Sequence, residues 1–261
     1  MDWEFCSVER SGRIVTVRFD RGYPANPMSD ALMKELTDLA RWLDEDLETS
    51  VVVLTGRSDN FSMGFDLKEG RDPDASLLER RRAVQRGPRL CRAWEDLEQM
   101  TICAIEGWCV GGGVALATAL DLRVMGEGST LYVSEIERGM NMSWNSVPRF
   151  VNLCGPARTK RLVVMAERVG AEQAKEWGLA DELTPKGGAF DKAMVMAERI
   201  ASLPPVQVRM LKKDVDVAAK ALNHAVSFMD ADQFVLSQTS EDYREGVESF
   251  LEKRPPNYTG R

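Results

Sequence analysis

The sequence predicts an α/β protein with a parallel type of core. Short apolar, β-rich segments recur along the first two thirds of the chain, amphipathic helical segments alternate with them, and a glycine-rich hinge joins one such strand to a helix. The length of 261 residues allows one large domain, or a domain with a helical extension.

The elements of the first half follow each other as strand, helix, strand and helix. Residues 14–19 alternate in polarity and are rich in β-branched side chains, which predicts a strand. Ser29 can cap an amphipathic helix over residues 30–44, whose leucines fall on one face. Residues 51–55 form a continuous apolar run, typical of a short buried strand, and a charged helix is expected over residues 77–97.

A glycine triplet, Gly111-Gly112-Gly113, interrupts an apolar run. The segment before it predicts a buried strand, and residues 114–122 predict a short apolar helix. Glycines let the backbone turn tightly and bring N–H groups close to a ligand, and the helix dipole adds positive potential there. This arrangement suits a developing oxyanion, although close packing of a strand against a helix would also explain the glycines.

The triplet does not match the common phosphate-binding motifs. A dinucleotide fingerprint requires a glycine three residues beyond Gly113, where Leu116 stands. A Walker loop requires lysine followed by serine or threonine, but Val114 and Ala115 follow the last glycine. The sequence also lacks the G-x-S-x-G elbow of serine hydrolases.

The last third of the chain is predicted to be helical. Residues 130–133 predict one more short strand, and the apolar content falls after the break at residues 203–205. Helical stretches are then expected over residues 206–221, 225–236 and 241–252. We therefore expect a core over residues 1–203 and a C-terminal helical region over residues 204–261. A helical tail with few strands to pack against often covers another subunit, which predicts an oligomer.

Composition excludes several classes of function. A net charge of −7 argues against a nucleic-acid partner, which would require a broad basic face. The basic cluster at residues 79–92 is an exception that reads as a solvated helix face, although part of it could bind a polyanionic small molecule. His224 is the lone histidine, so neither a histidine-based triad nor a histidine-rich metal site is expected.

Cysteine usage and the N-terminal segment predict a cytoplasmic protein. The five cysteines form no C-x-x-C pair, so buried free thiols are expected rather than disulfides or a metal site. Residues 1–4 have neither the basic nor the apolar region of a signal peptide. The apolar stretches are shorter than the roughly 20 residues that span a bilayer, so no membrane association is expected.

Three segments carry a family resemblance: Phe-Ser-Met-Gly-Phe-Asp-Leu-Lys-Glu at 61–69, Glu-Gly-Trp-Cys-Val-Gly-Gly-Gly at 106–113, and Tyr-Val-Ser-Glu-Ile-Glu-Arg-Gly at 132–139. Asn26, residues 170–180 and residues 250–254 fit the same pattern. Together they resemble the enoyl-CoA hydratase/isomerase, or crotonase, superfamily over essentially the whole chain.

The resemblance implies a crotonase-type spiral of ββα turns, followed by a C-terminal α-helical region that makes trimer contacts, as a homotrimer or homohexamer. It implies a coenzyme A thioester as the substrate, with no separate cofactor and no metal. It also implies that the N–H groups of Phe65 and Gly112 hold the thioester oxygen. An enolate formed by loss of an α-proton needs such preorganised donors.

The catalytic carboxylates decide which reaction the resemblance implies. Family hydratases carry one glutamate three residues beyond the middle glycine, where this chain has Ala115, and a second where Glu135 stands. Glu135 is therefore the acid/base candidate, and an apolar acyl pocket should raise the pKa of its carboxyl. Glu106 and Glu137 are expected at the surface or in salt bridges.

The one-glutamate pattern resembles Δ3,Δ2-enoyl-CoA isomerases and hydroxycinnamoyl-CoA hydratase-lyases. Gly70 replaces the phenol-binding tyrosine of the latter, and no second tyrosine matches near residues 228–234, so a phenolic substrate is not supported. Residues 139–145 replace the glycine-rich loop that usually walls the acyl pocket. Within them, Trp144 either shapes a partly polar acyl pocket or simply packs in the core.

Coenzyme A is expected with its adenine near residues 21–27 and 64–68, held mainly by backbone groups. The residues expected to bind substrate or coenzyme A are Arg21, Pro24, Ala25, Met63, Gly64, Asp66, Leu67, Lys68, Gly111, Ser134, Arg138 and Trp144.

The sequence thus predicts an enzyme that stabilises a thioester enolate, with Glu135 as acid/base. Double-bond isomerisation or one-glutamate hydration is expected, with retro-aldol cleavage after hydration as an option. The alternative is a catalytically silent scaffold that keeps coenzyme A binding or oligomerisation. The retained Glu135 and the intact glycine triplet favour the enzyme.

Overall fold

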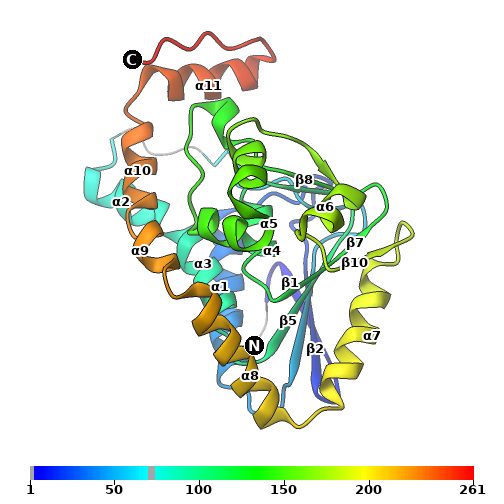
Figure 1. The fold of residues 1–261 in the computed structure, drawn as a ribbon. Coiled ribbons are helices and arrows are strands. Elements are labelled where there is room, and N and C mark those ends of the chain that lie inside the picture. The colour runs from blue at the N-terminus through cyan, green and yellow to red at the C-terminus, as the bar shows by residue number, and fades with distance from the viewer. Residues whose placement is uncertain (1–2, 70–73) are drawn as a thin grey trace.

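The computed structural model describes residues 3–69 and 74–261, and its strands form two sheets (Figure 1). The large sheet has the order β1 (Cys6–Ser11), β2 (Ile14–Phe19), β3 (Val51–Thr55), β5 (Met100–Ile105), β7 (Leu122–Gly126) and β10 (Glu182–Thr184). Its strands run parallel except for the antiparallel β1–β2 pair. The predicted strands at 14–19 and 51–55 are confirmed.

The small sheet has the order β4 (Asn60–Ser62), β6 (Trp108–Val110), β8 (Thr130–Tyr132) and β9 (Val169–Gly170). Each of the consecutive pairs β3–β4, β5–β6 and β7–β8 puts its first strand in the large sheet and its second in the small sheet. A helical segment follows each pair, so the chain advances by one ββα turn at a time. This arrangement confirms the predicted spiral.

Both faces of the large sheet are covered, which explains why its central strands are mostly apolar. Val52 and Leu54 of β3 belong to the main core, which includes α1 (Asp30–Asp44) and α3 (Arg86–Glu95). Val51 and Val53 point the other way and pack with alanines of α7 (Ala189–Ala201). Every residue of β3 is buried.

The predicted start of α1 is correct because a capping side chain marks it, whereas α3 and α4 (Gly112–Ala117) have no side-chain cap and their bounds differ from the prediction. Ser29 accepts a hydrogen bond from the Leu32 N–H (3.0 Å) and starts α1 where predicted. The charged segment expected as one helix is two, α2 (Leu77–Val84) and α3, which meet at Gln85. The apolar helix after the triplet, α4, ends earlier than predicted because Leu122 begins β7.

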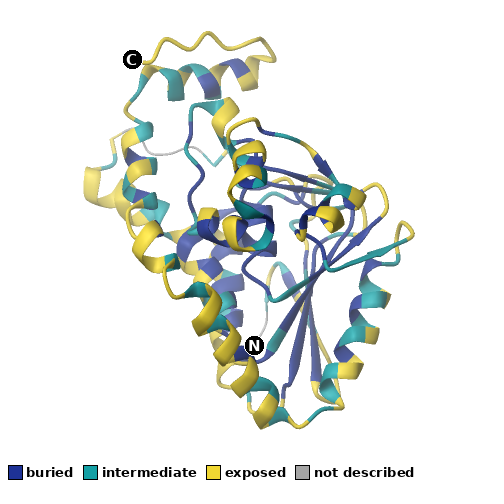
Figure 2. Cartoon of the chain, in the orientation of Figure 1, coloured by how far each residue is buried: buried dark blue, intermediate teal, exposed yellow. Residues whose placement is uncertain are grey.

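The C-terminal helices form an arm along one side of the molecule (Figure 1). Between the core strands and the arm come η1 (Glu135–Arg138), α5 (Ser146–Val163) and α6 (Ala171–Trp177). The arm consists of α8 (Pro205–Lys220), α9 (Asn223–Ser227), α10 (Asp230–Ser237) and α11 (Glu241–Glu252). Its α9, α10 and α11 pack on α5, α2 and η1 respectively. Figure 2 shows much of the arm exposed.

Two further predictions can be placed on the fold. All five cysteine side chains are buried, as expected, and His224 lies in α9. Within residues 3–69 and 74–261, no helix is long and apolar enough to cross a membrane. The division of the chain at residue 203 and a cytoplasmic location stay predictions.

Candidate active site

The glycine triplet forms a tight turn between β6 and α4. Gly111 has φ 50° and ψ −114°, a conformation that glycine adopts at little steric cost. Its N–H donates to the Tyr132 carbonyl (2.8 Å), which ties the turn to the end of β8. Gly112 is the first residue of α4, so its N–H has no acceptor inside the helix and points out of the helix start.

The backbone at Phe65 lies next to this turn. The Met28 N–H donates to the Gly64 carbonyl (2.8 Å), and the Asp66 N–H donates to the Met28 carbonyl (3.0 Å). Both partners of Met28 flank Phe65, so the Phe65 N–H faces away from Met28. A Cβ on Gly64 would lie 2.8 Å from the Val110 carbonyl oxygen and 3.5 Å from the Gly112 nitrogen.

The two amides therefore come from adjacent stretches of backbone. Among the described residues, neither the Phe65 nor the Gly112 N–H donates a hydrogen bond. Two unpaired amides, one of them at the start of a helix, are suited to an oxyanion. The arrangement agrees with the expected oxyanion hole, whose function stays a prediction.

Asn26 fixes the segment that carries Phe65. Its buried side chain donates to the carbonyls of Phe19 (3.2 Å) and Phe61 (2.8 Å). The Ser62 hydroxyl donates to the Asn26 carbonyl (2.9 Å) and accepts from the Gly64 N–H (3.1 Å). Asn26 thus acts as an internal support, and its φ of 43° lies in a region that asparagine tolerates.

The Glu135 carboxyl packs directly on the glycine turn. A Cβ on Gly111 would lie 2.5 Å from Glu135 Oε1, so no larger residue fits there without displacing the carboxyl. Glu135 Oε2 is buried, and it has no hydrogen-bond partner among the described residues. The carboxyl thus faces the turn with one oxygen unpaired.

Burial raises the pKa of Glu135 to about 7, and backbone amides and the Arg138 charge oppose this shift only in part. No other carboxyl of the described residues is among the groups that shift this pKa. Near neutral pH the Glu135 carboxyl is therefore present in both protonation states, as a group that removes and returns a proton must be.

Ala115 and Trp144 also lie beside the turn, and the Ala115 N–H donates to the Gly111 carbonyl (3.0 Å). Ala115, where hydratases of the resembled family carry a glutamate, is fully buried. The Trp144 ring reaches within 2.6–3.1 Å of a Cβ built on Gly112. The indole therefore borders the oxyanion turn itself. Trp144 is also partly buried against the main core, and its role in shaping an acyl pocket stays a prediction.

A charged network that sequence reasoning missed holds the Trp144 loop. The buried Arg149 donates to the Trp144 carbonyl (2.9 Å) and forms an ion pair with Glu95 (2.6 Å). The Asn145 N–H donates to Asp230 in α10 (2.6 Å). These residues lie far apart in the sequence and match no motif, so the sequence carried no signal of the network.

Most of the residues expected to bind substrate or coenzyme A lie in the segments 21–27 and 63–68. The Met63 N–H donates to the Ala25 carbonyl (2.9 Å), which joins the 21–27 loop to the 63–68 segment. Of the remaining expected positions in these segments, Pro24 and Lys68 are exposed, Arg21, Asp66 and Leu67 are half-buried, and Gly64 is buried. Their role in binding stays a prediction.

Arg138 lies outside these segments and is engaged within the chain, as is Arg21, which pairs with Glu69 (3.8 Å). The Arg138 guanidinium lies 4.1 Å from the Phe250 ring centroid, and its Nη1 donates to the carbonyl of the buried Ser134 (2.8 Å). A Cβ on Gly246 would lie 2.3 Å from the Arg138 carbonyl carbon, so α11 packs closely on η1. The structure thus gives Arg138 a supporting position beside Glu135.

The two other glutamates differ from each other. Glu106 is buried and accepts a hydrogen bond from the Ala189 N–H (3.0 Å) at the start of α7, so the expectation of a surface position was wrong. A carboxylate is stabilising at a helix N-terminus, which explains the burial. Glu137 is exposed and accepts from the Tyr132 hydroxyl. Gly70 lies outside the described residues.

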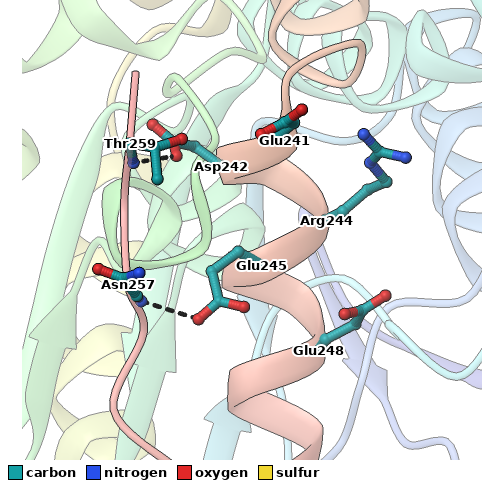
Figure 3. A pocket seen from close by; sticks show the side chains of 7 residues that line it. All are labelled: Glu241, Asp242, Arg244, Glu245, Glu248, Asn257 and Thr259. Carbon is teal, nitrogen blue, oxygen red and sulfur yellow. Dashed lines mark hydrogen bonds between the residues drawn. The ribbon is translucent and has the colours of Figure 1, made fainter. Parts of the chain in front are cut away.

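Two surface cavities lie away from the oxyanion turn. One of about 340 Å³ is lined by Glu241, Asp242, Arg244, Glu245, Glu248, Asn257 and Thr259 (Figure 3). There the C-terminal tail is tied to α11 by hydrogen bonds from the Asn257 and Thr259 N–H groups to carboxylates. The other, of about 440 Å³, lies between α5 and α9–α10. Glu135 and the glycine turn line neither.

Comparisons with known proteins match nearly the whole chain to one family. The enoyl-CoA hydratase/isomerase family model matches residues 9–261. The chain is 27% identical over 256 residues to the 2,3-dehydroadipyl-CoA hydratase of Escherichia coli (strain K12), covering 97% of this chain and 98% of that protein.

Solved structures show the same likeness. An enoyl-CoA hydratase structure from Bacillus anthracis is 31% identical, has a TM-score of 0.78, and is matched over 99% of this chain and 100% of that chain. An enoyl-CoA hydratase structure from Mycobacterium avium subsp. paratuberculosis K-10 reaches a TM-score of 0.88 with the same coverage, and at 21% identity it shows the fold. The chain belongs to the enoyl-CoA hydratase/isomerase family of acyl-CoA enzymes.

Proposed function

We propose that the chain catalyses proton transfer on a coenzyme A thioester with Glu135 as its one acid/base group, and that the reaction is double-bond isomerisation. The observation that carries this proposal is the Glu135 carboxyl packed on the Gly111 turn, with a pKa of about 7. A group near its pKa is equally able to take up and to return a proton.

The proposed steps need only residues of this site. The thioester oxygen accepts hydrogen bonds from the N–H groups of Phe65 and Gly112. The Glu135 carboxylate removes a proton from a carbon next to the double bond, and the resulting dienolate keeps its charge on the oxygen held by these donors. The Glu135 carboxylic acid then returns the proton to the carbon at the other end of the conjugated system, so that no atom is gained or lost.

One-glutamate hydration is the second candidate, and the names of the relatives favour it. The Escherichia coli relative is named a 2,3-dehydroadipyl-CoA hydratase. In hydration, Glu135 would take a proton from water as the water attacks the β-carbon, and would pass a proton to the α-carbon. Ala115 offers no second carboxylate to orient that water, which is why we rank isomerisation first. Retro-aldol cleavage would follow hydration.

The surface of residues 21–27 and 63–68 is the proposed binding site of coenzyme A. The hydrogen bond between Met63 and Ala25 holds the two segments together, and Lys68 is exposed beside them. Binding through backbone groups would let a chain of net charge −7 hold a polyanion. Isothermal titration with coenzyme A at two salt concentrations tests this. Absence of binding at both would contradict the assignment.

We propose that the protein is a homotrimer or homohexamer assembled through the arm. Within α8, all of which is described, Lys212 alone is buried. Large apolar side chains are exposed along the arm, among them Val206, Met210, Val217, Leu222, Val226 and Phe228. An exposed apolar surface of this extent is typical of an interface.

The reaction is tested with a panel of saturated, 2-enoyl and 3-enoyl thioesters of coenzyme A in D2O, read by mass spectrometry. Isomerisation predicts deuterium without added water, hydration predicts a product one water heavier, and cleavage predicts a shortened acyl group. Glu135→Gln is the matched control. A scaffold would bind the thioesters and leave all of them unchanged.

A further inference from the structure

We propose that Trp144 restricts the site to short-chain enoyl thioesters by forming a fixed wall beside the oxyanion turn. The inference rests on the proposed function and names the substrate class of the same site. The observation behind it differs from the one behind the proposed function: it is the space that the chain leaves around the Trp144 indole ring.

Two glycines from different helices make that room. A Cβ at Gly112 in α4 would lie 2.6 Å from Cη2 of the Trp144 ring, and a Cβ at Gly87 in α3 would lie 2.0 Å from its Cε2. Both described glycines lack a positive φ, so backbone conformation does not require glycine at either position. Glycine is also a poor helix former. The contact with the indole is what excludes a larger residue.

The ring lies where an acyl chain would leave the oxyanion hole. Gly111 faces the Glu135 carboxyl, and the next residue, Gly112, faces the indole. A thioester that accepts from the Gly112 N–H and presents its α-carbon to Glu135 therefore has the indole as a neighbour. The 440 Å³ cavity is lined by Met142, Val147 and Asp230, which neighbour the Trp144 loop, but not by Trp144 itself.

Hydrogen bonds and an ion pair fix the backbone that carries the Trp144 ring, so we expect the ring to stay in place rather than swing aside. Arg149, buried and paired with Glu95, donates to the Trp144 carbonyl (2.9 Å). The next residue, Asn145, is bound through its N–H to Asp230 (2.6 Å). Trp144 and Asn145 both have a positive φ, 64° and 57°, and for a tryptophan this conformation is strained and persists only when its surroundings fix it.

The test measures kcat/KM, or the rate of deuterium uptake, for but-3-enoyl, hex-3-enoyl and oct-3-enoyl thioesters. One methylene that fails to fit a pocket changes discrimination by roughly 10–200-fold. We therefore expect the wild type to prefer the butenoyl over the octenoyl substrate by at least about 100-fold. Trp144→Ala should reduce this preference at least tenfold and leave the affinity for coenzyme A alone unchanged.

Matched variants keep the test decisive. Trp42→Ala removes another partly exposed tryptophan, in α1, and should keep the wild-type preference. Trp144→Phe serves if Trp144→Ala does not fold, and should shift the preference in the same direction. Gly87→Ala should impair the wild type and be nearly neutral in Trp144→Ala, because the three atoms nearest to its Cβ all belong to the Trp144 ring.

Two results would overturn the inference: equal activity of the wild type on all three lengths, or an unchanged preference in the folded Trp144 variants. Both leave the proposed function standing. Failure of the proposed function looks different, since the wild type would then exchange no deuterium into any thioester, whatever its length.

Discussion

The spiral core and the C-terminal arm contribute to the candidate site in different ways. The core supplies backbone: the Gly111 turn, the Gly112 amide and the Phe65 amide, each fixed by strand pairing and by Asn26. The arm supplies side chains that support the reactive group, through Phe250 on Arg138 and Asp230 on the Trp144 loop. The core thus holds the amides proposed as the oxyanion hole, whereas the arm contacts Arg138, beside the proposed acid/base group, and the Trp144 loop.

The largest expected effect lies at the point where core and arm meet. Glu135→Gln should lower turnover by roughly 10²–10⁴-fold, because positioned acid/base groups contribute that much. The amide is uncharged and similar in shape, so the affinity for coenzyme A should stay within a few-fold. Steady-state kinetics and isothermal titration measure the two quantities. Activity like that of the wild type would move the chemistry to another residue, with Glu137 the next to examine.

Comparing Gly111→Ala with Gly128→Ala separates the effect of backbone strain from the effect of the contact with Glu135. The Cβ would lie 2.5 Å from Glu135 Oε1, and φ is 50°, so we expect a loss of about 1–3 kcal/mol in the free energy of unfolding and nearly complete loss of activity. Gly128→Ala is the control, because it has φ +82° with no atom within 4 Å of its Cβ. It should lose stability and keep its activity. Equal activity of both variants would contradict the packing argument.

Removal of the arm tests its role in assembly. A chain truncated after Ser202 loses α8 to α11, and with them the contacts on α5, α2 and η1. We expect aggregation or loss of the oligomer, measured by light scattering. A stable monomer of the full chain would refute the proposed trimer or hexamer.

Phe250→Ala tests whether the arm tunes the acid/base group. Arg138 opposes the burial that raises the pKa of Glu135, and Phe250 holds the Arg138 guanidinium. When Arg138 is less well placed, the pKa should rise by roughly one unit at most. As pH falls through its pKa, the Glu135 carboxylate is protonated and can no longer act as a base. A higher pKa should therefore move the acidic limb of the pH–rate profile to higher pH. The conservative Phe250→Tyr should keep the wild-type profile, and an unmoved limb in Phe250→Ala would exclude the coupling.

The smallest effect is expected from Ala115→Glu. A second carboxylate one helical turn beyond Gly112 could orient water, so hydration of crotonyl-CoA should rise from a low wild-type rate. The gain should be modest, because Ala115 is fully buried and two close carboxyls raise each other's pKa. Ala115→Glu with Trp144→Ala should hydrate faster than Ala115→Glu alone. Efficient hydration by the wild type would show that the missing glutamate does not limit the enzyme.

The contrast between core and arm also explains which features the sequence could predict. Strands β2 and β3, helix α1 and the Gly111 turn follow from local patterns, because periodicity, a cap and a glycine run act over a few residues. The apolar run after Gly113 was assigned too long a helix, since periodicity does not separate a buried helix from the buried strand that begins at Leu122. The contacts of Trp144 with Gly87, and of Phe250 with Arg138, join residues far apart in sequence. Only the folded chain reveals them.

The central claim is that Glu135 alone transfers the proton. The most direct measurement is the exchange of the α-hydrogens of butyryl-CoA in D2O, followed by NMR from pH 5.5 to 8.5 (about 1.5 units either side of the Glu135 pKa of about 7). The wild type should exchange them at a rate that rises with pH and levels off above about 7, the pKa of Glu135, and Glu135→Gln should exchange them at least about 100-fold more slowly. Equal exchange by the two proteins, or none by a wild type that binds the thioester, would contradict the claim.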